Sequence, residues 1–138
     1  ADPLMGAGGV IAPPQSYLPN VQALLSEHDI LLWADEVICG FGRTGNDFGS
    51  TTMGIKPDLM SFAKQLSSAY VPISAAVIPG AMYDAMAEQS TGVGIFGHGY
   101  TYTGHPVACA AALKALEAER QRWASICSLG CRSIQAMS

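Results

Sequence analysis

The chain has 138 residues, of which 49% are hydrophobic and only 13% are charged, so it fits one ordinary domain that buries much of itself. Its net charge of −4, without any cluster of Lys and Arg, argues against nucleic acid or an anionic membrane as the main partner. No apolar run approaches the roughly 18 residues that span a bilayer, so we expect a cytoplasmic protein that acts on small molecules.

The first half of the chain is predicted to form a helix followed by strands. The apolar spacing of residues 19–28 predicts a helix with Pro19 in its first turn. The continuous apolar run of residues 30–34 predicts a strand covered on both faces, as in a parallel sheet, and residues 58–62 predict a second strand. Residues 40–54 are rich in Gly, Thr, Asn and Ser and predict a long loop. A helix that leads into a buried strand indicates an α/β fold.

The second half continues the alternation. Residues 73–78 predict another buried strand, residues 81–89 a helix, and residues 90–99, with four glycines, a flexible connection. Pro106 marks the start of an Ala-rich helix that we expect to end near Arg120. The acidic residues stop at position 119, and the composition changes there. We therefore divide the chain into a domain of residues 1–119 and a divergent C-terminal tail of residues 120–138.

Lys64 and Asp35 are the most informative residues, because each stands at the carboxyl end of a predicted strand. Ligands of open α/β sheets bind at such ends. A Lys amine can form a Schiff base with the aldehyde of pyridoxal phosphate, and a carboxylate can keep the pyridine nitrogen protonated. A Lys directly after an apolar run is costly unless it is paired or functional, whereas Lys56 and Lys114 have ordinary surface contexts. The pair predicts a pyridoxal phosphate site with both residues catalytic.

Other interpretations of the same region stay open. Residues 40–45 match G-x-G-x-x-G, the turn of dinucleotide-binding hydride-transfer enzymes, although the residues that follow are poor helix formers. Asp35 and Glu36 could also be a solvated acidic pair or a metal site, and Arg43 could meet an anionic substrate or form an ion pair. The four cysteines and three histidines show no familiar zinc spacing, so we predict no metal and expect buried thiols.

Four stretches in order resemble one enzyme family. They are residues 5–14, 34–45, 57–64 and 98–107, and the second reads Ala-Asp-Glu-Val-Ile-Cys-Gly-Phe-Gly-Arg-Thr-Gly. On these stretches the chain resembles the class III pyridoxal-phosphate-dependent aminotransferases, the ω-aminotransferase group of fold type I. The resemblance implies that residues 1–119 are part of the large cofactor-binding domain, an α/β fold with a mainly parallel sheet flanked by helices.

The resemblance also implies a role for each matched site residue. Lys64 would form the Schiff base and move the proton, Asp35 would pair with the pyridine nitrogen, and Val37 would pack against one face of the ring. Thr101 would reach across a dimer interface to the phosphate of the partner's cofactor. The resemblance therefore implies a homodimer with shared sites, and the mean hydropathy of +0.24, high for so small a domain, also favours covered surface.

The implied reaction is the transfer of an amino group between an amine or ω-amino acid and a keto acid. Ile38 stands where ornithine-type and 4-aminobutyrate-type members usually carry Gln, and Ile38-Cys39 is more like the branch that uses pyruvate as the acceptor. Asp2 stands where the family generally has Glu. Family chains run to several hundred residues, so the alternative expectation is a truncated, catalytically inactive fragment that retains the cofactor motifs.

Overall fold

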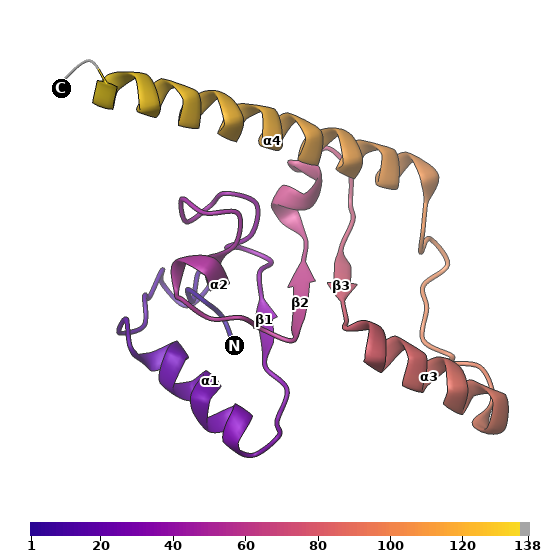
Figure 1. The fold of residues 1–138 in the computed structure, drawn as a ribbon. Helices are drawn as coiled ribbons and strands as arrows, with labels where there is room; N and C mark the ends of the chain where they lie inside the picture. Colours follow the sequence, from indigo (N-terminus) through magenta and orange to yellow (C-terminus); the bar gives the residue numbers. More distant parts are fainter. Residues whose placement is uncertain (136–138) are drawn as a thin grey trace.

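The computed structural model describes the backbone of residues 1–135 and the side chains of residues 1–122. Its elements in chain order are α1 (Tyr17–Glu27), β1 (Trp33–Asp35), α2 (Gly49–Thr52), β2 (Leu59–Phe62), the 3-10 helix η1 (Lys64–Ser67), β3 (Ala75–Val77), α3 (Gly80–Val93) and α4 (Pro106–Gln135). The sheet lies in the middle, with α1 and α3 toward one end of the strands and α4 across the other (Figure 1). The predicted α/β fold is confirmed.

The three strands form one small mixed sheet in the order β1-β2-β3. Strands β1 and β2 are parallel, with Trp33 opposite Leu59 and Asp35 opposite Ser61, whereas β3 runs antiparallel to β2. Because β1 and β2 point the same way, both end at the edge of the sheet that faces α4 (Figure 1). That edge is where the sequence places Asp35 and Lys64.

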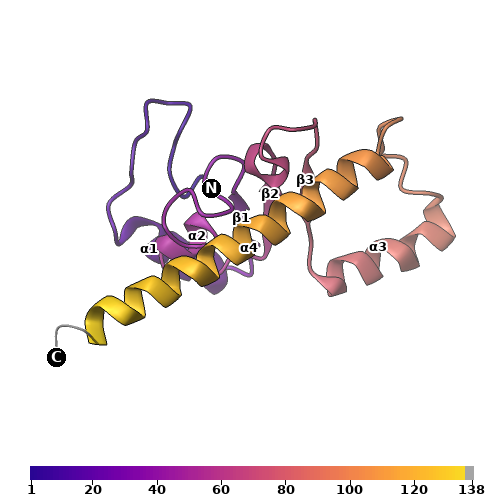
Figure 2. The same cartoon turned by 90° about the horizontal axis from the view of Figure 1, so that it is seen from above.

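Two separate clusters of buried side chains stabilise this arrangement. The first packs α1 against the start of β1 and the segment after α2, and its buried members are Leu18, Leu32 and Ile55. The second joins the end of β2, η1 and α4, and its buried members are Phe62, Leu66 and Ala112. Seen from above, α4 passes over the ends of the strands (Figure 2). The second cluster therefore fixes η1 between the sheet and α4.

The expected coverage of the strands on both faces was wrong for the described residues. Along β1, Ala34 is fully buried but Trp33 is 49% exposed, and every residue of β3 is exposed. Successive strand residues point to opposite faces, so a half-covered sheet produces this pattern. A continuous apolar run predicts a strand, but it does not reveal which of its faces the rest of the chain covers.

Two helices also differ from the sequence prediction. The predicted loop of residues 40–54 contains the short helix α2, although Gly, Ser and Thr have weak helix propensity. Helix α4 continues to Gln135 rather than ending near Arg120, because residues 120–129 contain neither Pro nor Gly to stop it. The division at residue 119 falls inside this helix and stays a prediction. Within the described part of the chain, no helix has the length and apolarity needed to cross a membrane.

Candidate active site

Lys64 is the first residue of a strained turn just beyond β2. Its backbone φ is +46°, and at the other end of the turn Ser68 and Ala69 have φ values of +50° and +64°. Residues with a side chain seldom adopt this left-handed conformation, which costs on the order of 1–3 kcal/mol each. A turn with three such residues persists only when its surroundings hold it in place.

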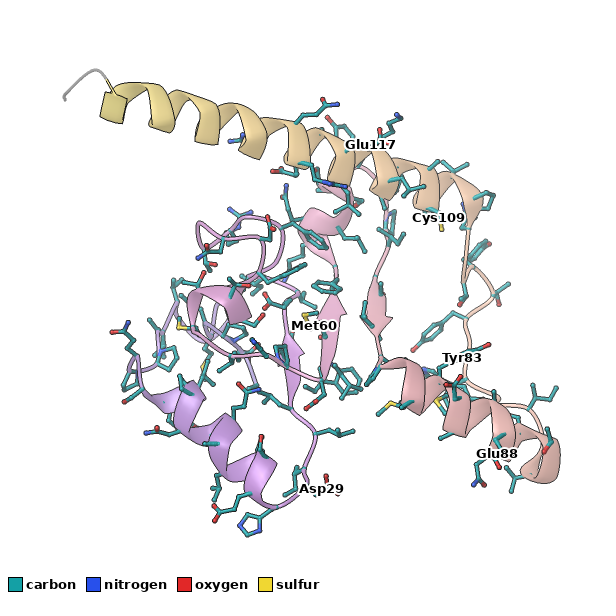
Figure 3. The ribbon with its side chains drawn as sticks, in the orientation of Figure 1. Asp29, Met60, Tyr83, Glu88, Cys109 and Glu117 are labelled. Carbon is teal, nitrogen blue, oxygen red and sulfur yellow. The ribbon has the colours of Figure 1, made fainter. Side chains whose placement is uncertain are left out.

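Contacts with α4 hold the turn. Leu66 is 8% exposed and packs in the cluster that contains Phe62 and Ala112. Next to it, the side-chain Nε2 of Gln65 donates a hydrogen bond of 2.9 Å to Oε1 of Glu119 on α4. Figure 3 shows the side chains between these elements, with Met60 labelled on β2. The backbone of Lys64 is therefore positioned by a helix that is distant in the sequence.

Replacing Leu66 by Ala should destabilise the chain by about 2–4 kcal/mol, because it removes a buried side chain and leaves a cavity beside Phe62 and Ala112. Urea unfolding measures the free energy. Leu113→Ala is the matched control on α4, where the side chain is 62% exposed, and it should change stability by less than about 0.5 kcal/mol. Equal losses in the two variants would mean that Leu66 is not what docks the turn.

Asp35 ends β1 at the same edge of the sheet. It pairs with Ser61 of β2, three residues before Lys64, and its side chain is exposed. Its Oδ1 accepts a hydrogen bond of 2.9 Å from the backbone N–H of Val37. The residue Val37 is partly buried. Within the part of the chain that the structure describes, the other oxygen, Oδ2, accepts no hydrogen bond. One carboxylate oxygen is thus fixed and the other is available to a ligand.

Lys64 lines two open hollows beside its turn. One has a volume of about 400 Å³ and is shared with Ile38 and Arg43, and the other, of about 290 Å³, lies toward Tyr70. No carboxylate is among the residues that line either hollow. The lining of the first hollow therefore includes two cationic side chains, those of Arg43 and Lys64.

Thr101 lies apart from these groups. It begins a turn between α3 and α4, its side chain is exposed, and it lines neither hollow beside Lys64. Within this turn, Thr103 Oγ1 accepts a hydrogen bond of 3.0 Å from the backbone N–H of Tyr100. The structure thus places Asp35 at the end of β1 and Lys64 just beyond the end of the neighbouring β2, but it does not add Thr101 to that group within one chain.

Glu36 has a part in this region that the sequence interpretation missed. Its side chain is 1% exposed, its Oε2 accepts a hydrogen bond of 2.8 Å from Gly49 N–H, and its Oε1 accepts one of 2.7 Å from Ser50 N–H. Asp35 and Glu36 are therefore not a solvated acidic pair, because one is exposed and the other caps α2. Strand alternation was the available signal, since it places Glu36 on the buried face with Ala34.

The dinucleotide interpretation does not fit this geometry. Gly45 has a φ of +93° and is followed by loop residues, so no helix opens at the third glycine. The next helix, α2, begins at Gly49, and the carboxylate of Glu36 already occupies its N-terminus. A pyrophosphate therefore has no free helix end here. Among the described residues, no group of three or more His, Cys, Asp or Glu side chains could hold a metal ion.

The Aminotransferase class-III family model matches residues 1–126. The chain belongs to the class III aminotransferase family. It is 55% identical over 122 residues to the probable gamma-aminobutyrate transaminase 2, mitochondrial, of Oryza sativa subsp. indica, and 53% identical to the vanillin aminotransferase of Capsicum frutescens. These matches cover 88% of this chain but 24% and 27% of the two relatives. The aminotransferase chain thus spans about a quarter of the length of these relatives.

Solved structures give the same result for the fold. A transaminase solved with L-ala superposes with a TM-score of 0.85 at 55% identity, over 88% of this chain and 29% of the other. The omega transaminase from Pseudomonas jessenii in complex with PMP also gives a TM-score of 0.85, at 52% identity, over 88% and 27%. The predicted family and fold class are confirmed, and the family is one of pyridoxal-phosphate-dependent enzymes. Because several relatives are named mitochondrial or chloroplastic, the cytoplasmic location stays a prediction.

The two cysteines of this aminotransferase chain whose side chains are described differ in burial. Cys39 is fully buried, as predicted, and its Sγ donates a weak hydrogen bond of 3.6 Å to the carbonyl of Leu4. Burial raises the pKa of the Cys39 thiol, and the carboxylate of Glu36 acts in the same direction. Cys109, in the first turns of α4, is exposed, so its predicted burial was wrong. The side chains of Cys127 and Cys131 lie outside the described residues.

Proposed function

We propose that this chain carries the cofactor-binding residues of a transaminase that moves an amino group between an amine or ω-amino acid and a keto acid, with pyruvate as the acceptor. The proposal is supported by the parallel pairing of β1 and β2, since β1 ends with Asp35 and Lys64 follows the same end of β2. The choice of pyruvate is supported by Ile38 and by the matched transaminase solved with L-ala, the amino acid that corresponds to pyruvate.

The described residues fit pyridoxal phosphate. The N–H of Val37 fixes one oxygen of the Asp35 carboxylate, and the second oxygen can accept a hydrogen bond from a protonated pyridine nitrogen. The amine of Lys64 makes no hydrogen bond or ion pair with any described residue, so it is available to an aldehyde. Both side chains are exposed at this end of the sheet and are accessible to a ligand.

The chemistry follows from these two groups. Bound pyridoxal phosphate supplies a ring that withdraws electrons from the substrate carbon. Asp35 holds a proton at the pyridine nitrogen, because its negative charge favours the protonated form. Lys64 Nζ would hold the cofactor through its aldehyde and would serve as the base and acid that removes and returns the proton at the substrate carbon. Val37, two residues after Asp35, packs against one face of the ring.

A homodimer with shared sites is part of the proposal. Thr101 lies away from the hollows of Lys64 in its own chain and is exposed, as a residue would be that serves a partner's cofactor. The many large apolar side chains exposed on one chain also favour a covered surface, and they include Tyr70, Tyr100 and Tyr102 at 78–84% exposure. In this proposal the hydroxyl of Thr101 binds the phosphate of the cofactor held by the partner's Lys64.

Mixing two inactive variants tests the shared site. A Lys64→Ala chain and a Thr101→Ala chain should each bind pyridoxal phosphate poorly, whereas their mixture forms dimers with one intact site. We expect the mixture to recover tight binding at up to about a quarter of the wild-type stoichiometry, because half of randomly assorted dimers are mixed and each has one intact site of two. The control is Thr91→Ala on α3, used in place of Thr101→Ala. This variant should bind pyridoxal phosphate tightly by itself, before it is mixed with Lys64→Ala. No recovery would argue against a shared site.

The reaction itself is tested by product formation. The chain loaded with pyridoxal phosphate should form L-alanine from pyruvate only when an amine donor is present, and 2-oxoglutarate in place of pyruvate tests the choice of acceptor. The exposure of Lys64 and Asp35 favours a second candidate, a chain that keeps the cofactor residues without turnover. Covalent cofactor binding without any amine-dependent change in its absorbance would establish that second candidate and exclude the first.

A further inference from the structure

Glu36 is a buried charge stabilised by backbone groups. Among the described residues, no Lys, Arg or His forms an ion pair with it. A buried carboxylate is costly unless it is fully hydrogen-bonded. Here each of its oxygens accepts one N–H, from Gly49 at 2.8 Å and from Ser50 at 2.7 Å, and these are the first N–H groups of α2, which have no partner within the helix. The side chain is therefore a rigid link between the end of β1 and α2.

This link fixes the chain next to Asp35. Ala34 and Glu36 are buried on one side of the chain, and Asp35 between them points to the other side, where it is exposed. The backbone is held on both sides of that residue, since Asp35 N–H donates to the carbonyl of Ala1 at 2.8 Å and Glu36 N–H donates to that of Ser61 at 2.9 Å. With the Glu36 side chain anchored as well, the peptide that carries Asp35 cannot rotate about the strand axis.

We propose that Glu36 is a positioning residue that acts through Asp35, fixing the direction of the carboxylate that meets the pyridine nitrogen. Only a side chain with two acceptors at this length satisfies both N–H groups. Gln offers one acceptor and one donor, so its amide N–H would face an N–H of α2, and Asp is one methylene too short to reach both. The consequence for cofactor binding rests on the proposed function, whereas the effect on Asp35 can be measured without cofactor.

The first test uses amide hydrogen exchange, followed by NMR, on the full chain without cofactor. In Glu36→Gln the amides of Gly49 and Ser50 should exchange about tenfold faster, and so should that of Val37, whose N–H reports the position of Asp35 Oδ1. Leu18→Ala, in the other cluster, is the control and should accelerate exchange in α1 but not at Val37. If Glu36→Gln does not fold, Glu36→Asp, which keeps the charge, carries the same comparison. Unchanged exchange at Val37, with faster exchange at Gly49, would overturn the proposal.

The second test is a double-mutant cycle on the dissociation constant of pyridoxal phosphate, measured from its absorbance. Glu36→Gln should weaken binding about tenfold, and Asp35→Asn should weaken it at least as much. Because Glu36 acts through Asp35, the double variant should bind no more weakly than Asp35→Asn alone. Losses that multiply would overturn the proposal. If the unaltered chain binds no pyridoxal phosphate, the proposed function fails, and the exchange at Val37 still decides whether Glu36 positions Asp35.

Discussion

Replacing Lys64 by Ala should abolish covalent attachment of pyridoxal phosphate to the chain. Reduction with borohydride converts the linkage between a lysine amine and the cofactor aldehyde into a stable bond, so the wild-type chain should gain the mass of one reduced cofactor and Lys64→Ala should gain none. The expectation rests on position. Lys64 follows β2 at the edge of the sheet where β1 ends with Asp35. Intact-mass spectrometry makes the comparison.

Lys56→Ala is the matched control for this prediction. Lys56 is also exposed, but it precedes β2, and its backbone is tied to α1 by hydrogen bonds with the Gln22 side chain. The Lys56→Ala chain should therefore gain the same mass as the wild-type chain. Peptide mapping that finds the cofactor on Lys56 or Lys114, or an increment that survives in Lys64→Ala, would contradict the assignment of Lys64.

Gly49→Ala should cost about 2–3 kcal/mol of folding stability, near the upper end for overpacking a buried site. An added Cβ would lie 2.5 Å from Cβ of Cys39 and 2.9 Å from Cβ of Pro3, and 3.2 Å from Oε2 of Glu36. The first two atoms are close to the backbone and cannot swing away. The new methyl group would therefore push α2 away from Cys39 and Pro3 and break the hydrogen bonds that Glu36 accepts. Urea unfolding measures the loss.

Gly80→Ala is the control for the added methyl group. Gly80 begins α3, and a Cβ built there meets no atom within 4 Å. Its stability should change by no more than about 0.5 kcal/mol, since Ala favours a helix and meets no obstacle. Similar losses at Gly49 and Gly80 would show that the packing around Gly49 relaxes easily, and the anchoring of α2 by Glu36 would then need another explanation.

Asp35 and Lys64 could be predicted because each has a reactive side chain next to a local sequence pattern that predicts a strand. Asp35 and Lys64 each stand at the end of an apolar run, and parallel strands bring such ends to one edge without any knowledge of the loops between them. The four family stretches add the roles. The roles of Lys64, Asp35, Val37 and Thr101 stay predictions.

Features that depend on distant parts of the chain could not be predicted in this way. The partners of Glu36 are backbone N–H groups 13 and 14 residues away. Every residue except Pro has such a group, so the residue types do not reveal which ones Glu36 binds. Exposure of β3 depends on what covers the sheet, which an apolar run does not reveal. The helix α2 forms because a carboxylate caps it, so the low helix propensity of its residues was misleading.

The contacts between η1 and α4 should also couple ligand binding at Lys64 to folding. Gln65 and Glu119 are 54 residues apart, so a contact beside the left-handed backbone of Lys64 exists only while α4 is docked. Coupling free energies are reciprocal, so a ligand that binds Lys64 in this conformation must also stabilise the docked helix. In the proposed function that ligand is the cofactor, so a substitution on α4 that weakens its docking should lower both the stability of the chain and its affinity for pyridoxal phosphate.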